Sequence, residues 1–572
     1  MEPRSGNANR SEDTETLVLA SSDSSLHLEI GSQELPVLRF WLLSIGLLTG
    51  LLLSFLDTSI VATSIFAIAT EFDDLTIVNW VALAYTLAYL GFAVLLARIS
   101  DVIGRRDAFI IFYFIFITFS IACGFSRSLV ELIACRAVQG LGGSGLYSIT
   151  MIILPEVAPR KMQKYIGGLI GVVMTLSSVL GPVLGGALTQ YTTWHWIFWI
   201  NGPVGVLSML LFYLSWPKKE YLPIAEKKSW KELDYVGSIL LIAAAVLVVF
   251  PFQNAGLDAD QWSKAKAIFV APLVAGVALW LGLFIWCIYI DLRWGHVMSA
   301  ALPVRLLRDH VYAAIVANTL LLGFPYMLVI YAFPLRLQIV NGKDPLMAGL
   351  MLLPMLGSSA VGSFFSGAFN TKKNMIFETV ITGTCFVVLG CGLLSTLSSS
   401  HEVEPKALGF LVFVGLGFGM VVSTATLAAR IHSSDKDHAS AQGLVAQVRV
   451  LGGSIGIAAS TAIAGAMLRK KMKHVHGRQL ASLEGRSDVL SQTLPAAVRQ
   501  AYSDAFNEDM RVCAIIGGVA VLVALGAFSR KRLTLDGRME QQSKEKLARQ
   551  NATQSSPTLV DHAATESLHS QG

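Results

Sequence analysis

Charged residues are scarce in this sequence. Aspartate, glutamate, lysine and arginine make up 15% of its 572 residues, whereas hydrophobic residues make up 53%. A typical soluble domain carries about 25% charged residues. The shortage of charge, together with a mean hydropathy of +0.58, excludes an ordinary soluble fold and indicates a polytopic membrane protein.

Several functional motifs are also missing. The six cysteines form no CxxC pair and have no histidine at metal-ligand spacing, so we expect free thiols and no metal site. The absence of a GxxxxGK(S/T) phosphate loop disfavours an ATP-driven pump, and no nucleophile constellation indicates an enzyme. The net charge of +5 comes from short basic clusters between apolar runs, which excludes nucleic acid as a partner.

Long apolar runs dominate the rest of the chain. A helix needs about 20 apolar residues to cross the hydrocarbon core. Fourteen stretches qualify: 40–67, 78–98, 108–125, 129–153, 165–189, 194–216, 235–252, 267–290, 311–334, 346–368, 376–397, 406–430, 442–467 and 511–530. The sequence therefore predicts an all-α polytopic membrane protein with 14 transmembrane helices.

Two glycine-rich segments, 167–186 and 443–460, indicate an internal repeat. Each would be the fifth span of a six-helix half, as in transporters built from repeats. We therefore expect two six-helix bundles, at 40–216 and 311–530. Between them, 217–310 would hold an inserted helix pair with cytoplasmic linkers. Disordered cytoplasmic tails are expected at 1–39 and 531–572. Within the second bundle, 468–510 is predicted to be a long extracellular loop.

Basic residues predict the orientation. The loops after even-numbered spans hold eighteen lysines and arginines, and the short loops on the other side hold six. Cytoplasmic loops carry this excess, so both termini are expected in the cytoplasm. The basic run that opens 468–510 conflicts with this, but long loops translocate largely regardless of charge. The sequons at Asn9 and Asn551 then lie in cytoplasmic tails, and we expect neither to be glycosylated.

Arg136 lies inside the apolar segment Leu132–Gly145. A charge at the bilayer centre costs about 2.5–3.5 kcal/mol on insertion scales, so such an arginine normally faces a cavity or a partner. Arg136 shares a helical face with Gly140 and Gly143, and Gln139 lies beside them. We expect Arg136 to border an aqueous path. The alternative is that it only joins helices through backbone carbonyls, with the glycines as a packing surface.

Asp57 is the candidate partner of Arg136. It stands among apolar residues of the first span, on a face that also holds Ser54 and Ser64. A buried carboxylate near a cation is suited to carry a proton near neutral pH. The alternative is a carboxylate at the helix end, close to the membrane interface.

Two further motifs predict moving parts. In the turn after the second span, Asp101, Gly104, Arg105 and Arg106 could form a latch between helix ends, although plain topogenic charge would explain the two arginines. In the fifth span, Pro182 bends the helix, and Gly181, Gly185 and Gly186 allow close helix approach. Such a bent helix can seal two halves together.

These motifs, in this order, resemble the major facilitator superfamily, specifically its fungal fourteen-span drug:proton antiporter branch. The matching segments are "LDTSIVATSI" (56–65), "SDVIGRR" (100–106), "RAVQGLGGSG" (136–145), "GPVLGG" (181–186), "WHWIFWINGPVG" (194–205) and "QVRVLGGSIGIA" (447–458). Ala97, Ser177 and His195 depart from the family pattern. The resemblance implies two bundles that rock around a central site, with Arg136 and Asp57 in proton coupling.

The sequence indicates less clearly which residues bind the transported molecule. The cavity candidates are Tyr85, Tyr89, Gln139, Asn318, Tyr326 and Arg449. A mostly apolar, aromatic cavity with few polar groups suits amphipathic organic compounds. Packing between helices, or against lipid, is the alternative for each single aromatic residue.

The leading hypothesis is a proton-coupled exporter of a hydrophobic or amphipathic molecule, such as a secondary metabolite, toxin or drug. We expect a monomer in the plasma membrane whose partners are the organic substrate, protons and the lipid bilayer, without a cofactor. One alternative is a vacuolar transporter of cationic solutes such as basic amino acids, which would need several inward carboxylates. The other is a non-transporting sensor that signals through its tails.

Overall fold

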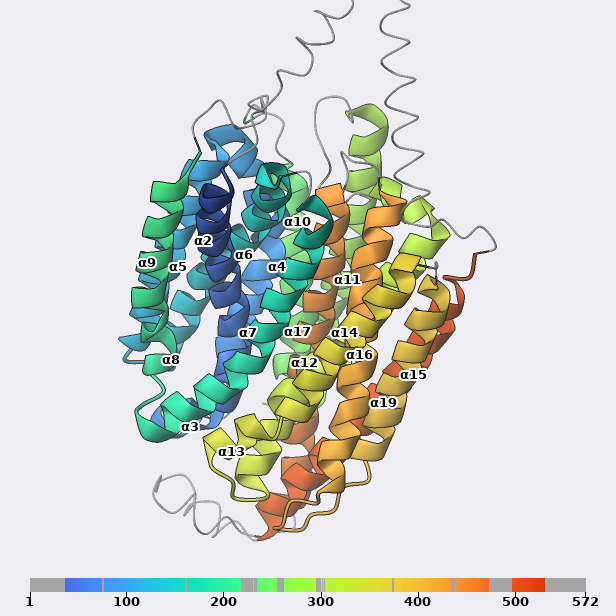
Figure 1. Ribbon diagram of the computed structural model, residues 1–572. Coiled ribbons are helices and arrows are strands. Elements are labelled where there is room, and N and C mark those ends of the chain that lie inside the picture. Colours follow the sequence, from blue (N-terminus) through green and yellow to red (C-terminus); the bar gives the residue numbers. More distant parts are fainter. Residues whose placement is uncertain are drawn as a thin grey trace, which may run out of the picture.

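The computed structural model describes residues 36–74, 77–159, 162–217, 230, 234–254, 262–294, 300, 302, 304–372, 375–433, 438–472 and 496–529 (Figure 1). Predictions for the two tails, for Asn9 and Asn551 and for the middle of the 468–510 loop concern residues outside these ranges. Much of the predicted linker on either side of 230 also lies outside them.

Every regular element in the described part of the chain is a helix. The elements are α2 (Val37–Ile60), η1 (Val61–Thr63), α3 (Ile65–Glu71), α4 (Trp80–Ile103), α5 (Arg105–Gly124), α6 (Leu129–Val157), α7 (Gln163–Tyr191), α8 (Trp196–Trp199), α9 (Asn201–Ser215), α10 (Tyr235–Asn254), α11 (Trp262–Arg293), η4 (Val304–Arg308), α12 (His310–Ile339), α13 (Pro345–Leu350), α14 (Leu353–Lys372), α15 (Ile376–Leu394), α16 (Lys406–His432), α17 (His438–Met472) and α19 (Ala496–Leu525).

Within these ranges, twelve helical segments are long and apolar enough to cross a membrane, and α4 makes thirteen if its two parts count as one span. The two parts of α4, Trp80–Ala93 and Leu95–Ile103, meet at an angle of 52°. The last predicted span, 511–530, begins inside α19, whose preceding turn carries Glu508 and Asp509. A multi-pass helical membrane protein is therefore confirmed, and the count of fourteen spans stays a prediction.

The helices pack as two groups with matching contacts (Figure 1). In the first group α2 packs on α7 and α9, α4 on α6, and α5 on α6 and α9. In the second group α12 packs on α17 and α19, α14 on α16, and α15 on α16 and α19. The same pairing in the same order is the packing expected of an internal repeat. We call these groups the first half (α2–α9) and the second half (α12–α19).

The loop predicted at 468–510 is shorter at both ends. Helix α17 continues to Met472, and α19 already starts at Ala496. The early start of α19 has a packing reason, because Ala501, Ala505 and Phe506 recur at helical spacing and are buried.

Arg336 follows the span predicted at 311–334 but lies inside α12, because this helix runs on to Ile339. Its guanidinium is buried and donates to Ser503 Oγ at 3.2 Å and to the carbonyl of Ser398 at 2.6 Å. Because these acceptors bind its guanidinium, the charged Arg336 side chain can be buried in the last turn of a long apolar helix.

Helices α10 and α11 pack against each other, and α10 also packs on α4 of the first half and α17 of the second. A Cβ added to Gly91 of α4 would clash with Ile242 of α10, so the two helices are in close contact. The pair therefore lies over the line where α4 meets α17, which we call the α4–α17 seam.

Candidate functional site

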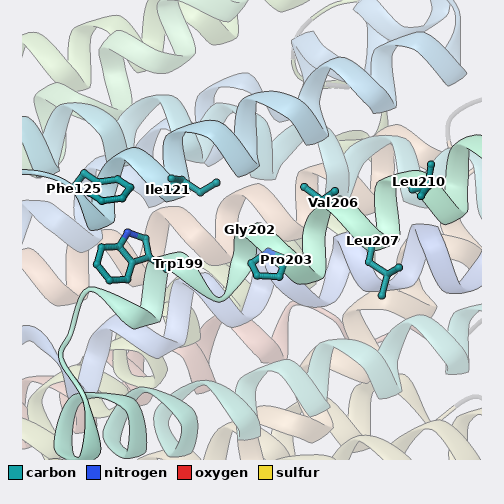
Figure 2. A pocket seen from close by; sticks show the side chains of 8 residues that line it. All are labelled: Ile121, Phe125, Trp199, Gly202, Pro203, Val206, Leu207 and Leu210. Atoms are coloured by element: carbon teal, nitrogen blue, oxygen red, sulfur yellow. The ribbon is translucent and has the colours of Figure 1, made fainter.

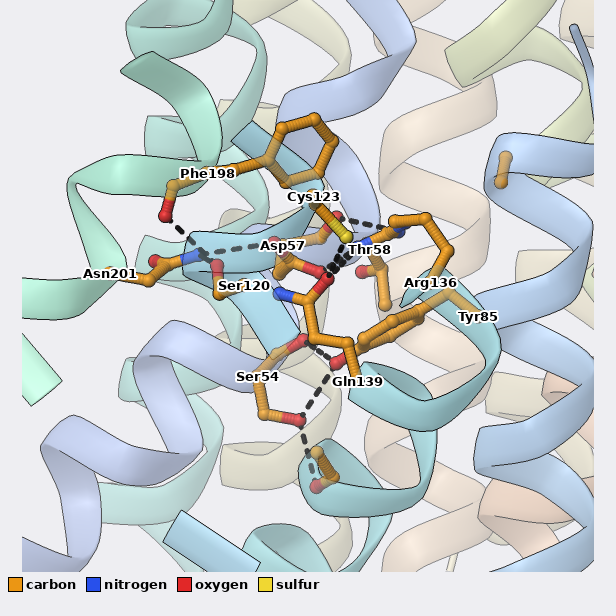
Figure 3. A network of polar contacts seen from close by, with 12 residues as sticks. Ser54, Asp57, Thr58, Tyr85, Ser120, Cys123, Arg136, Gln139, Phe198 and Asn201 are labelled. Atoms are coloured by element: carbon orange, nitrogen blue, oxygen red, sulfur yellow. Dashed lines mark hydrogen bonds and ion pairs between the residues drawn. The ribbon is translucent and has the colours of Figure 1, made fainter. Parts of the chain in front are cut away.

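A buried ion pair lies at the centre of the first half (Figure 3). Arg136 of α6 pairs with Asp57 of α2, and both side chains are completely buried. An unpaired charge inside a membrane protein is costly, so each of these charges stabilises the other. The structure thus brings together the cation and the carboxylate that the sequence singled out.

The other donors of Arg136 also have partners in the protein. Its Nε donates to the carbonyl of Val81 at 3.0 Å, and its Nη1 donates to Gln139 Oε1 at 2.9 Å. The guanidinium carbon lies 4.3 Å from the centre of the Tyr85 ring, and the Tyr85 hydroxyl donates to the carbonyl of Ser54 at 2.9 Å. Gln139 and Tyr85, which we expected to line a cavity, are fully buried and position Arg136 instead.

The expectation that Arg136 borders an aqueous path is not met in this conformation. The side chain has no exposed surface. Asp57, Gln139 and the backbone supply the acceptors that water would otherwise provide. The ion pair is therefore closed to water in this state.

Asn201 is a member of this site that the sequence did not single out. It is the first residue of α9, directly after the short α8, and its Nδ2 donates to Asp57 Oδ1 at 3.1 Å and to Ser120 Oγ at 3.0 Å. The only sign of its role in the sequence is that an amide stands inside the apolar segment 194–205. A buried amide needs hydrogen-bond partners. Asn201 fixes the Asp57 carboxylate from the side opposite Arg136 (Figure 3).

The predicted latch residues meet at the end of α4. Asp101 and Arg105 are paired at 3.6 Å, and Arg105 also pairs with Glu156 near the end of α6. The Arg106 guanidinium lies over the Tyr213 ring of α9, 4.6 Å from its centre. In this conformation these contacts join α4, α5, α6 and α9, which all belong to the first half.

Gly104 turns the chain between α4 and α5 with a φ of +104°, and an added Cβ would meet no atom within 4 Å. The backbone conformation, not space, therefore requires glycine. We expect Gly104→Ala to lower the free energy of unfolding by about 1–3 kcal/mol, the usual cost of such strain. Thermal unfolding of the purified protein in detergent measures this. Gly409→Ala is the matched control, because Gly409 is helical, has equally open surroundings, and should gain about 1 kcal/mol from alanine; equal melting temperatures for the two variants would contradict the prediction.

Helix α7 contacts α2 through two of the predicted glycines. A Cβ at Gly181 would clash with Ser59, and a Cβ at Gly185 would clash with the carbonyl of Ile60. The glycines let α7 approach the end of α2 and the following turn η1. This is the close helix approach that the glycine spacing predicted.

Gly186 lies in contact with the second half. A Cβ there would clash with the carbonyl of Pro345 in α13, and a Cβ at Gly349 of α13 would clash with the carbonyl of Pro182 in α7. Each helix thus presents a glycine to a carbonyl of the other. We call this reciprocal arrangement the α7–α13 glycine contact.

Two hydrogen bonds join the halves near the same end of the molecule. Tyr331 of α12 donates its hydroxyl to the carbonyl of Thr58 at 2.5 Å, and Gln338 Nε2 donates to the carbonyl of Thr63 at 3.2 Å. Figure 1 shows this end at the bottom of the view, where α13 lies beside the end of α7. Because Thr58 follows Asp57 in α2, the buried ion pair and the contact between the halves share one short segment of chain.

The remaining cavity candidates separate into two groups. Tyr89 and Arg449 lie where α4 and α17 meet, because Gln447, two residues before Arg449, donates to the carbonyl of Leu90, which follows Tyr89. Tyr326 is close by in α12, where Gly323, three residues before it, packs on the Arg449 backbone. Asn318 is elsewhere: it is fully buried, and its Nδ2 donates to Thr384 Oγ1 at 3.2 Å and to a carbonyl of α19 at 2.9 Å. Asn318 therefore joins helices of the second half.

A second buried carboxylate, Asp509 of α19, was not predicted because it precedes the span expected at 511–530. Its Oδ2 accepts a hydrogen bond from Ser460 Oγ at 2.6 Å, while its Oδ1 has no partner. Asp509 packs inside the second half. Elsewhere, the described residues contain no group of three side chains suited to hold a metal ion.

An apolar groove lies on the outer surface of the first half, between α5 and α9 (Figure 2). It is lined by Ile121, Phe125, Trp199, Gly202, Pro203, Val206, Leu207 and Leu210. Membrane-spanning helices form this surface, so lipid covers it. Apart from the Trp199 indole, no side chain there could orient a polar ligand, and none of the candidate site residues reaches it.

These features define a class of protein. Two similarly packed helical halves that contact each other at one end and along the α4–α17 seam, with a charged pair buried in one of them, form the architecture of a secondary transporter. The family model described as "Major Facilitator Superfamily" matches residues 47–457 of the chain. The protein belongs to this superfamily, which is a family of transporters and not of enzymes.

Fungal transporters are similar along most of the chain. An MFS-type transporter of Fusarium mangiferae, FPY5, is 32% identical, covering 88% of this chain and 87% of its own. The MFS-type efflux pump LUC4 of a Fusarium species is 28% identical, covering 73% of each chain. The rubrofusarin-specific efflux pump aurT of Gibberella zeae is 26% identical, covering 82% of this chain and 86% of its own.

Solved structures share the fold. A bacterial homologue of the human lysosomal transporter Spinster, in an inward-facing and unoccupied conformation, gives a TM-score of 0.60. The match covers 87% of this chain and all of that one at 14% sequence identity. At this identity the likeness concerns the fold alone.

Proposed function

We propose that this protein exports a hydrophobic or amphipathic small organic molecule, such as a secondary metabolite, toxin or drug, in exchange for protons by alternating access. The observation that carries the proposal is the buried pair of Asp57 and Arg136 next to the contact between the halves. Efflux pumps among the similar proteins support export as the direction.

Protonation of Asp57 would couple the proton to the motion. A neutral Asp57 no longer balances the charge of Arg136, and breaking a buried ion pair costs about 3–5 kcal/mol. The segment after Asp57 bears the carbonyls of Thr58 and Thr63, which accept the hydrogen bonds from the second half. A shift of this segment would loosen those bonds and favour opening at this end. Because the pair is closed to water here, the proton must arrive in another conformation.

The proton gradient supplies enough energy for such export. One elementary charge that crosses 100 mV releases about 2.3 kcal/mol, and a tenfold proton gradient adds about 1.4 kcal/mol. One proton can therefore support roughly a few-hundred-fold gradient of a neutral solute.

In the membrane we propose fourteen spans, with α19 as the last and α10 and α11 as a pair inserted between two six-helix bundles. Both termini would be cytoplasmic, which places the contacts made by α3, η1 and α13 at the outer end. The protein would act as a monomer in the plasma membrane, without a cofactor. The Asp101–Arg105–Glu156 contacts at the cytoplasmic end would rearrange when the halves close there.

Asp57→Asn tests the coupling. Asparagine keeps the shape and one acceptor oxygen, but it has no charge and cannot carry a proton at neutral pH, so we expect transport that no longer depends on pH, or no transport. Proteoliposomes that contain the pH dye pyranine report proton movement when a panel of fluorescent hydrophobic compounds is added under an imposed pH gradient.

The matched control is Asp107→Asn, because Asp107 is an exposed carboxylate in the first turn of α5. This variant should behave as the wild type. A wild-type pH dependence of efflux in Asp57→Asn would reject the coupling role.

A further inference from the structure

Arg449 of α17 is a cation without a counter-ion. It is partly exposed, and it makes no hydrogen bond and no ion pair with any residue that the structure describes. By contrast, the guanidinium of Arg136 pairs with Asp57 and donates hydrogen bonds to acceptors of the protein. A guanidinium at membrane depth needs an anion, a carbonyl or water, so its free donors indicate a missing partner.

Arg449 lies between the two halves and not on the lipid face. Gln447, two residues before Arg449, donates from Nε2 to the carbonyl of Leu90 at 3.1 Å, and Leu90 directly follows Tyr89 in α4. Helix α17 therefore meets the first half at this level. The Arg449 backbone packs directly on Gly323 of α12, where a Cβ would clash with its carbonyl. The side chain is therefore held at the place where the halves face each other.

A second polar group at this place also lacks a partner. The Tyr89 hydroxyl is buried and makes no hydrogen bond with any residue in the described part of the chain. A buried hydroxyl without a hydrogen-bond partner is destabilising. Tyr89 and Arg449 thus carry unused hydrogen-bond donors on two helices, α4 and α17, that pack against each other from opposite halves.

Aromatic rings surround these donors on both sides. In the first half, the Tyr147 ring lies 5.8 Å from that of Tyr89 and 5.7 Å from that of Phe55. In the second half, the rings of Tyr326 and Phe418 are stacked with centres 3.5 Å apart. Rings of this kind bind planar aromatic molecules through stacked or edge-on contacts.

We propose that Arg449 binds the negatively charged group of the substrate, and that the substrate is an aromatic organic anion, a carboxylate or an ionised phenol. The anion supplies the missing counter-charge of Arg449 and accepts from the Tyr89 hydroxyl, while the rings hold its aromatic part. This assignment rests on the proposed export function, because it names the chemical class of the exported molecule. Charge-assisted bonds from a guanidinium to such a group are among the strong ones in proteins.

Binding to the purified full-length protein in detergent tests the assignment. The probes are 7-diethylaminocoumarin-3-carboxylate and its neutral carboxamide, which share one aromatic ring system and differ in charge. We expect the wild type to bind the carboxylate about 10- to 100-fold more tightly, as for one charged hydrogen-bonded contact. In Arg449→Gln the two probes should bind equally, with the affinity for the carboxamide unchanged. Arg449→Lys should retain part of the preference.

The matched control is Arg511→Gln, which removes an exposed arginine that pairs with Glu508 on α19. It should keep the full preference for the carboxylate. A wild type without preference for the carboxylate, or an Arg449→Gln variant that keeps the preference, would overturn the assignment.

A transport measurement separates this test from that of the proposed function. If the charge preference depends on Arg449 but a pH gradient drives no export in proteoliposomes, the anion site stands and the export function fails. If a pH gradient drives export of the neutral carboxamide and the wild type shows no charge preference, only the anion site fails.

Discussion

Replacing Arg136 by leucine is expected to abolish export while the protein still reaches the membrane. Leucine removes the cation that pairs with Asp57 and that lies over the Tyr85 ring. The loss of a buried ion pair corresponds to about 3–5 kcal/mol, so we expect the rate of pH-driven export to fall by roughly 100-fold or more. Proteoliposomes with an imposed pH gradient measure this rate.

A misfolded variant would give the same loss, because Arg136→Leu leaves the buried Asp57 carboxylate without a counter-charge. The double variant Asp57→Asn with Arg136→Leu removes both charges and is the appropriate control. Replacing a buried ion pair by neutral groups is often neutral for stability. We therefore expect the double variant to melt close to the wild type and still to show no proton-dependent export. Normal export in either variant would exclude the pair from the coupling.

The second large effect is expected at the α7–α13 glycine contact. Gly349→Ala places a Cβ against the carbonyl of Pro182, a backbone group that no rotamer change can move. Overpacking of this kind costs about 1–3 kcal/mol, which shifts the balance between closed and open states by roughly 5- to 150-fold. Export should fall, because the halves no longer close fully at this end.

Gly357→Ala in α14 is the matched control, since its Cβ would meet no atom within 4 Å. The two variants can be compared through a cysteine introduced as Thr63→Cys, at a buried position next to the contact, after replacement of the native cysteines. A membrane-impermeant maleimide should label it faster in Gly349→Ala than in Gly357→Ala. Equal labelling and equal export would show that the contact does not govern closure.

Sequence patterns predicted the helical architecture and the partners in the buried pair for clear physical reasons. A membrane forces long apolar runs into helices, so their positions can be read directly from the sequence. A charge in such a run needs an opposite charge, and Asp57 was the only acidic residue that stood well inside a predicted span. Gly186 could be assigned to a surface of close approach because glycine has few other uses in a helix.

The tertiary partners were not predictable in the same way. Asn201 lies far in the sequence from its partner Asp57, and Glu156 lies far from its partner Arg105. A single polar residue in or beside a span has no periodicity that would indicate its partner. The exposure of an arginine depends on which acceptors the fold brings to it. This is why Arg136 is sealed, although an aqueous border was expected.

The placement of α10 and α11 restricts how a fat-soluble cargo can arrive. Helix α10 covers the α4–α17 seam from outside and carries α11 on it, whereas at the opposite boundary α7 meets α14 without an additional helix among the described residues. Compounds dissolved in the bilayer would therefore find this side of the boundary between the halves covered. We expect them to enter from the bilayer on the other side, between α7 and α14.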